Sequence, residues 1–190
     1  HRDEAAAAAS VGMVGVLAEC MALVPSASVA TPASAPAPEW WPRTFLRYAR
    51  AVETGAVYQA RWPGGEFSGS LCDLVEQRVL PAVAAGANLL DADADARSGA
   101  YLLETVPAVL LILARHGGDP EETIVRAVND TWDNDTIGAV VGAAMGALHG
   151  VDALPKRWRD RLLGRTREAD DGRVQALIDR AVEVFLSGGC

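Results

Sequence analysis

The sequence predicts an all-α fold, and three observations support this. Half of the 190 residues are hydrophobic, which is enough apolar surface for one domain with a sizeable core. Aromatic residues make up only 6% of the chain while alanine is abundant, a composition that favours helices packed closely through small side chains. Runs of β-branched residues are short, which argues against sheets.

The first predicted helix covers residues 3–24. It is apolar on nearly every face, so we expect it in the middle of the bundle. A secretory signal or a membrane segment is the alternative, because an Ala-, Ser- and Pro-rich stretch follows it. The acids Asp3 and Glu4 at its start argue against that alternative and suit a helix N-terminus. Residues 25–39 have no periodicity and are predicted to form an exposed loop.

Two more helices and an acidic loop follow. Residues 40–61 show helical spacing of apolar side chains up to a Pro-Gly-Gly sequence, and residues 70–84 form the next helix, kinked or restarted at Pro81. Residues 86–99 break the periodicity and carry the alternating acids Asp91, Asp93 and Asp95. A calcium loop is the less favoured interpretation, because the glycine and glutamate that such a loop needs are missing.

The second half of the chain predicts five helices. Residues 102–116 form an apolar helix closed by two glycines, and Asp119 with Pro120 then starts a short helix that runs to about residue 128. Residues 136–148 form a helix of small residues whose glycines and alanines permit close packing. Two amphipathic helices are expected at residues 155–163 and 171–186.

Charge and cysteine content restrict the function. The chain has 17 basic and 25 acidic residues and a net charge of −8, which argues against binding nucleic acid or an anionic membrane. A phosphate-bearing ligand would therefore need a metal ion or a local basic pocket. Cys20, Cys72 and Cys190 are widely spaced and form no metal or disulfide motif, so we expect free thiols and a cytoplasmic location.

The residues that indicate chemistry lie in the segment 127–150. Asp133 and Asp135 are two residues apart, and Thr136 follows the second, directly before a helix. Two carboxylates and a hydroxyl are oxygen ligands of the kind that suit Mg²⁺ or Mn²⁺. The alternative is that Asp135 or Thr136 only caps the helix and the other acids are solvated.

Three segments in order resemble one family. The pattern AVNxxxDxDTIGAxxGAxxGAxxG at residues 127–150 resembles the C-terminal metal motif of the ADP-ribosylglycohydrolases, which include the dinitrogenase reductase-activating glycohydrolases and the crystallin J1-like proteins. Residues 98–108 resemble the family segment SGYxxDTLPAAL with one insertion, and residues 153–158 resemble ALPxxW. The start of the chain, from His1 to Asp3, resembles a THxD helix opening.

The resemblance implies an orthogonal multi-helix bundle of the ADP-ribosylglycohydrolase type, represented by its C-terminal half in one domain over residues 1–190. It implies two Mg²⁺ or Mn²⁺ ions held in part by Asp133, Asp135 and Thr136, with the two aspartates also catalytic. The ions would orient the ribose and activate water that attacks the anomeric carbon of an ADP-ribosylated protein or an ADP-ribose-containing small molecule. The residues expected to contact the substrate are His1, Ser98, Gly99, Tyr101 and Trp132.

Two departures from the family pattern qualify this expectation. The N-terminal half of the family, with its GDxxG opening and TDD triplet, is not in the sequence, so we expect a second chain or an N-terminal fragment to complete the site. Thr131 and Trp132 replace a usual glycine pair, and Asn134 replaces a threonine. Trp132 is expected either to stack on a base or ribose or to close the pocket. A non-catalytic binding or regulatory relative, and another adenine nucleotide or nucleoside hydrolase, are the competing functions.

Overall fold

The computed structural model describes residues 3–23, 35–61, 66–89, 98–158 and 173–186. The chain forms two compact units, His1–Ala153 and Leu154–Cys190. The first unit contains every predicted site residue that the structure describes. The prediction of a single domain over residues 1–190 stays a prediction, and the predicted 25–39 and 86–99 loops lie mostly outside the described residues.

The all-α prediction is confirmed, with one two-stranded antiparallel ladder added to the helices. The elements of the first unit are α1 (Glu4–Leu23), α2 (Trp40–Ala49), β1 (Tyr58–Gln59), β2 (Ser68–Gly69), α3 (Leu71–Leu74), the π-helical turn η1 (Val75–Val79), α4 (Leu80–Ala84), α6 (Leu102–His116), α7 (Pro120–Asn129), α8 (Asn134–His149) and the 3₁₀ turn η2 (Val151–Ala153).

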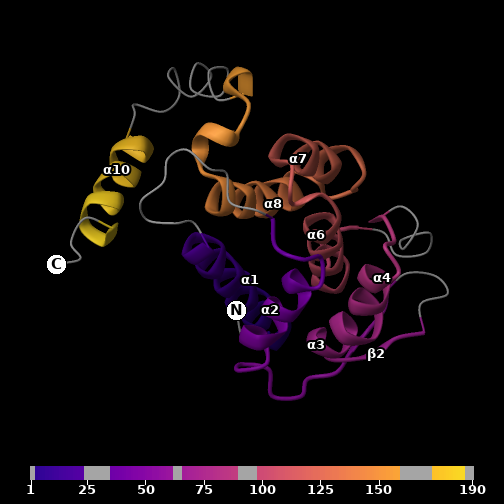
Figure 1. The fold of residues 1–190 in the computed structure, drawn as a ribbon. Helices are drawn as coiled ribbons and strands as arrows, with labels where there is room; N and C mark the ends of the chain where they lie inside the picture. Colours follow the sequence, from indigo (N-terminus) through magenta and orange to yellow (C-terminus); the bar gives the residue numbers. More distant parts are fainter. Residues whose placement is uncertain (1–2, 24–34, 62–65, 90–97, 159–172, 187–190) are drawn as a thin grey trace. The chain divides into compact units, whose positions relative to one another are not determined.

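Helix α6, and not α1, is the central helix of the first unit. It packs against α1, α2, α4, α7 and α8, and Figure 1 shows it among these helices. Nine of its residues are buried, including Leu103, Leu110 and Leu113. The apolar side chains of α6 are large, and burying a large apolar side chain removes more surface from water than burying alanine does. A central position is therefore more favourable for α6 than for the alanine-rich α1.

Helix α1 is buried on one face only, so the expectation that it lies in the middle of the bundle is wrong. Its buried face carries Gly12 and Gly15, against which the rings of Phe45 and Tyr48 of α2 pack. The opposite face exposes Val14 and Met21 at 64% and 55%. By length and composition alone α1 would cross a membrane, a property that it shares with core helices and signal sequences.

Helix α2 ends at Ala49, about twelve residues earlier than the sequence pattern predicts. The chain then turns, passes Gly55 at a φ of +112°, and forms the ladder in which Tyr58 pairs with Gly69. The Glu4 carboxylate of α1 accepts hydrogen bonds from the backbone N–H groups of Thr54 and Ala56. These hydrogen bonds join residues about fifty positions apart in the sequence. They hold the segment around residues 54–56 in a non-helical conformation, although the periodicity of the sequence indicates a helix there.

The predicted helix at 70–84 is present as the continuous run α3, η1 and α4. Ser70 and Asp73 form a capping box at its start. The Leu80 N–H donates to the Val75 carbonyl, the wide hydrogen bond of a π-helical turn, directly before Pro81. Because proline has no N–H and crowds the preceding turn, a wider turn lets the helix continue through it.

Helix α6 has the predicted bounds, and α7 begins at its predicted proline. The Asp119 side chain caps α7 by accepting from the Glu122 N–H at 3.1 Å. His149 at the end of α8 donates from Nε2 to the Gly117 carbonyl at 2.8 Å, which joins the C-termini of α8 and α6. Gly117 has a φ of −57°, so it is required by its close approach to Trp41 and not by a left-handed turn.

The second unit contains α10 (Arg173–Leu186), as predicted. Its side chains Leu177, Ile178 and Val182, expected to form a core stripe, are about half exposed or more in the structure. The preceding predicted helix at 155–163 is described only through Trp158, over whose ring the Arg157 guanidinium lies at 5.3 Å.

Candidate functional site

The first turn of α8 carries the predicted metal ligands. Asp133 is the N-cap residue, so the helix starts earlier than predicted and neither Asp135 nor Thr136 is its N-cap. The Asp133 side chain makes no capping hydrogen bond to the backbone. Instead, its Oδ1 accepts from the Thr136 hydroxyl at 3.0 Å. The acids of this turn are therefore not used to cap the helix.

The loop before α8 is attached to a distant segment through Ser98. The Trp132 N–H donates to Ser98 Oγ at 3.1 Å, and the Asp133 N–H donates to the Ser98 carbonyl at 3.0 Å. Ser98 is 2% exposed. Two segments that match the family pattern, at 98–101 and 132–136, thus lie against each other although more than thirty residues separate them.

The Ser98–Gly99 segment is in turn bound to the first turn of α6. The Gly99 N–H donates to Glu104 Oε2 at 3.1 Å, and the Gly99 carbonyl accepts from the Thr105 hydroxyl at 2.7 Å. Tyr101 is the N-cap of α6. Since α6 is the central helix, these bonds connect the loop at 132–133 to the core.

Tyr101 lies between two residues that sequence reasoning missed. Its hydroxyl donates to the Gln59 carbonyl at 3.2 Å, and the Arg61 guanidinium lies 4.0 Å from its ring centroid. An arginine over an aromatic face is held by the ring's electrostatic field. Arg61 follows β1 and is about forty residues from Tyr101, so no local sequence signal identifies it. Within the described part of the chain, Arg61 has no carboxylate partner.

The structure brings some predicted site residues together and leaves others apart. Asp133, Thr136, Trp132, Ser98 and Gly99 form one connected group. Asp135 is exposed and has no hydrogen bond to Asp133 or Thr136. Trp132 is 73% exposed. His1 lies outside the described residues.

The donor set is chemically suited to a hard divalent cation but incomplete. Asp133, Asp135 and Thr136 offer oxygen atoms only, as Mg²⁺ and Mn²⁺ prefer. Among the described residues there is no group of three His, Cys, Asp or Glu side chains placed to hold a metal ion. The Asp130 carboxylate, which precedes these donors in the chain, accepts from Arg126 of α7 at 3.4 Å.

The described cysteines are unsuited to nucleophilic catalysis. Cys20 in α1 and Cys72 in α3 are buried, and burial, the larger cause, raises the pKa of each thiol to about 12. The carboxylates of Glu19 and Glu53, respectively, contribute a smaller part of this rise in pKa. Because the thiolate is the reactive form, both groups are inert near neutral pH.

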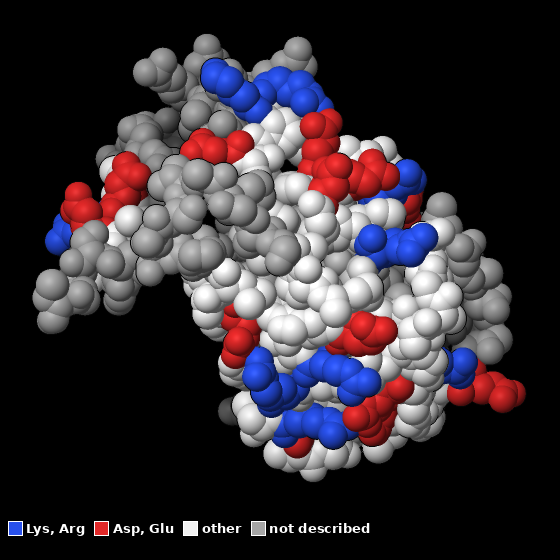
Figure 2. Space-filling model, in the orientation of Figure 1, with Lys and Arg blue, Asp and Glu red and all other residues white. Residues whose placement is uncertain are grey.

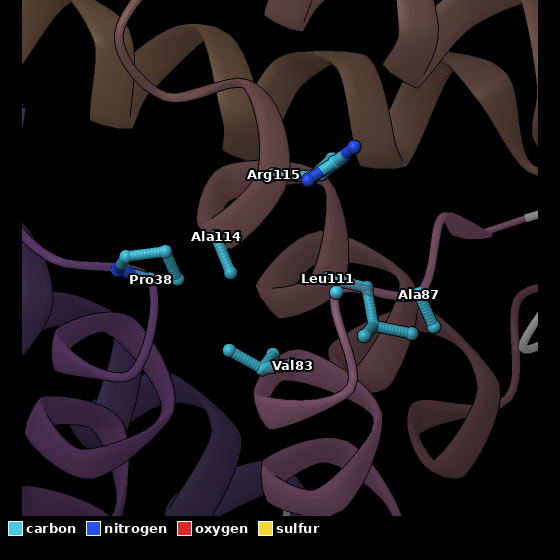
Figure 3. A pocket seen from close by; sticks show the side chains of 7 residues that line it. Pro38, Val83, Ala87, Leu111, Ala114 and Arg115 are labelled. Atoms are coloured by element: carbon cyan, nitrogen blue, oxygen red, sulfur yellow. The ribbon is translucent and has the colours of Figure 1, made fainter.

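A small cavity elsewhere in the first unit is not this site. It is partly open to solvent, is lined by Pro38, Val83, Gly86, Ala87, Leu111, Ala114 and Arg115 (Figure 3) and has a volume of about 90 Å³. An ADP-ribosyl group needs several times that volume. The cavity also contains none of the predicted site residues.

The charged side chains give no broad basic surface on the face shown in Figure 2. Basic and acidic side chains there lie next to one another. This agrees with the ion pairs of α2, in which Arg47 contacts Glu19 of α1 at 2.8 Å and Arg50 contacts Glu76 of η1. A phosphate-bearing ligand would find local positive charge at Arg61 rather than a general basic field.

Comparison with known proteins adds three findings. The model of the ADP-ribosylglycohydrolase family matches residues 1–188. The ADP-ribosyl-[dinitrogen reductase] glycohydrolase of Rhodospirillum rubrum is 32% identical over 95 residues, which are 48% of this chain and 28% of that protein. The uncharacterized protein YegU of Escherichia coli K12 is 39% identical over 57 residues, which are 30% of this chain and 17% of that protein. No solved structure matches the chain.

Proposed function

The chain belongs to the ADP-ribosylglycohydrolase family, and on this premise we propose that it is a metal-dependent hydrolase of an ADP-ribosyl glycosidic bond. Its substrate would be an ADP-ribosylated protein or a related ADP-ribose-containing small molecule. The observation that carries the proposal is the contact between two family-matched segments through Ser98, which accepts from the Trp132 and Asp133 N–H groups.

We propose that Asp133, Asp135 and Thr136 hold part of a pair of Mg²⁺ or Mn²⁺ ions. When bound, such ions lower the pKa of water and orient a substrate's hydroxyl groups. The Thr136 hydroxyl fixes one carboxylate oxygen of Asp133, leaving the other oxygen for a ligand. Asp135 is exposed and has no competing hydrogen bond in the described part of the chain, so its carboxylate is available as a ligand or a general base.

Three other side chains are proposed to bind the substrate. Trp132 presents a mostly exposed ring next to Asp133, which suits stacking on a base or ribose. Tyr101 would line the ribose pocket. Arg61, held over Tyr101, would supply the local positive charge that a chain with a net charge of −8 needs to attract a diphosphate.

Replacing the ligands one at a time tests the proposal. Asp135→Ala should abolish Mg²⁺-dependent release of ADP-ribose from a modified protein while leaving the fold intact, because an exposed charge is removed from a helix turn. Asp130→Asn is the matched control, since Asp130 pairs with Arg126 and should leave activity within about twofold. Full activity in Asp135→Ala would refute the metal assignment. Assays with ADP-ribose linked to arginine, linked to serine or carried by a free metabolite would identify the bond that is cleaved.

We also propose that an additional N-terminal segment completes the metal site. Three oxygen donors are fewer than the six that octahedral Mg²⁺ takes, and the aligned region covers 28% of the glycohydrolase from R. rubrum. Residues 1–190 should be assayed alone and together with the N-terminal half of a family member supplied as a second chain. Equal activity of residues 1–190 alone would refute the split site.

The same observations favour a second candidate, a relative that binds an ADP-ribosyl group without cleaving it. In that case neither sample in this assay releases ADP-ribose, while ADP-ribose still binds to the protein in calorimetry.

A further inference from the structure

Ser98 is the residue on which the position of the candidate site depends. Both of its oxygen atoms accept hydrogen bonds from consecutive N–H groups of the loop before α8, those of Trp132 and Asp133. At 2% exposed, it offers almost no surface to a substrate. Its place in the structure is therefore that of a support beneath the site.

The loop is anchored on its other side as well. The Thr131 hydroxyl donates to the Ala127 carbonyl of α7 at 2.5 Å, and both residues are buried. Thr131 thus ties the loop to α7, and Ser98 ties it to α6. Between these two anchors and the start of α8, the backbone of Trp132 and Asp133 has little freedom, although the Trp132 ring is exposed.

We propose that Ser98 is a positioning residue that fixes the Asp133 carboxylate and the Trp132 ring for metal and substrate binding. This inference rests on the proposed function, in which Asp133 is a metal ligand. Because the Ser98 hydroxyl accepts from the Trp132 N–H, its removal leaves a partly buried donor without its acceptor. The loop then gains freedom, and a ligand that is less well oriented binds metal more weakly.

The test compares three variants. Ser98→Ala removes the acceptor oxygen, and Ser98→Cys keeps nearly the same volume with a weak sulfur acceptor, which guards against a variant that fails to fold. The matched control is Thr123→Val, which also removes a fully buried hydroxyl from the first unit. The Thr123 hydroxyl donates to the His116 and Asp119 carbonyls and has no hydrogen bond to the described residues of the loop.

Two measurements follow for each protein. Amide hydrogen exchange of the peptide covering residues 130–137 reports the freedom of the loop. Mn²⁺ titration followed by electron paramagnetic resonance, with the N-terminal half of a family member supplied as a second chain, reports the affinity for the metal ion. Both Ser98 variants should speed exchange in this peptide and weaken Mn²⁺ binding by about tenfold or more. Thr123→Val should lower the melting temperature without either effect.

The outcomes separate this proposal from the proposed function. Loop exchange at the unsubstituted rate in both Ser98 variants would overturn the positioning role. Equal changes in Thr123→Val and the Ser98 variants would also overturn it, because they would indicate general destabilisation. If the unsubstituted protein, with the N-terminal half of a family member supplied as a second chain, binds no Mn²⁺ while the Ser98 variants still speed loop exchange, the metal assignment fails and the structural role of Ser98 stands.

Discussion

Helices α1 and α8 both carry glycines at helical spacing, yet their surroundings differ. In α1, a Cβ atom added to Gly12 or Gly15 would overlap the ring of Phe45 or Tyr48. In α8, a Cβ added to Gly142 or Gly146 would meet no described atom within 4 Å. The glycines of α1 are required by a packed neighbour, whereas Gly142 and Gly146 of α8 lie along a face that no described element fills.

The difference shows what a small-residue pattern does and does not predict. Glycine and alanine at spacings of three and four indicate a helix that another element can approach closely. They do not indicate that the other element is present in the same chain. The interpretation of α8 as closely packed through its glycines holds at Gly138, where an added Cβ would lie 3.2 Å from Val128, but is not met at Gly142 or Gly146.

The largest expected effect comes from removing the Phe45 ring, which packs against Gly12 in the contact between α1 and α2. Phe45 is fully buried, so Phe45→Ala should lower the free energy of unfolding by about 3–5 kcal/mol through lost burial and the cavity left behind. Urea unfolding followed by circular dichroism measures the change. A loss below about 1 kcal/mol would mean that α1 and α2 move together and fill the cavity left by the ring. The contrast between the packed glycines of α1 and the open face of α8 would then disappear.

A smaller loss of stability is expected when a methyl group is added to the packed contact between α1 and α2. In Gly15→Ala the new methyl group meets the Tyr48 ring near its Cβ, where the side chain has little freedom to move. Overpacking costs about 1–3 kcal/mol, and alanine's higher helix propensity returns up to about 1 kcal/mol, so the net change is a destabilisation. A thermodynamic cycle with Tyr48→Ala checks the cause, because the double variant should lose less stability than the sum of the two single variants.

The opposite sign is expected in α8. Gly146→Ala should raise the free energy of unfolding by about 0.5–1 kcal/mol, because alanine restricts the unfolded chain and the site has room for a methyl group. The same urea experiment measures it. Destabilisation by Gly146→Ala would show that something occupies this face in solution.

The smallest effect is a pH dependence of stability that arises outside α1 and α8, at the end of α6. Burial, together with the charge of Arg126, lowers the pKa of His116 at the end of α6 from its usual 6.5. As the pH falls through about 6.5, the unfolded chain binds the proton first, so stability decreases until the pH is below the pKa in the folded protein. His116→Gln should remove this decrease when unfolding is compared at about pH 7.5 and 5.5.

The start of α1 should respond only in stronger acid. The hydrogen bond from Tyr58 lowers the pKa of Asp3, and those from Thr54 and Ala56 lower the pKa of Glu4. Their contribution is present above the usual carboxyl pKa and is lost as the pH falls through the lowered value. A pH dependence between 7.5 and 5.5 that persists in His116→Gln would contradict the assignment of that step to His116.

The sequence predicted those parts of the fold that depend on neighbouring residues. Asp119 and Pro120 specify the start of α7, and a long apolar run followed by glycine specifies α6. The end of α2 was missed because it depends on the Glu4 carboxylate, fifty residues away. The central position of α6 was also missed, because periodicity shows that a helix is apolar on every face but not which of two such helices is surrounded.

The candidate site divides in the same way. The proximity of Asp133 and Thr136 follows from their spacing at the start of a helix. The resemblance placed Ser98 and Trp132 in one site, but their direct contact, and the stacking of Arg61 on Tyr101, needed the fold. A hydrogen bond between an ordinary serine and a backbone N–H leaves no pattern in a single sequence.

The buried thiols of Cys20 and Cys72 can be used to detect when the structure around them opens. Each is protonated near neutral pH and buried in a different element, Cys20 in α1 and Cys72 at the start of α3. In a variant with Cys190 replaced by serine, a thiol reagent can modify the protein only when one of these elements separates from the core. The two modification rates, resolved by mass spectrometry, therefore report separately how often each thiol becomes exposed, without any introduced label.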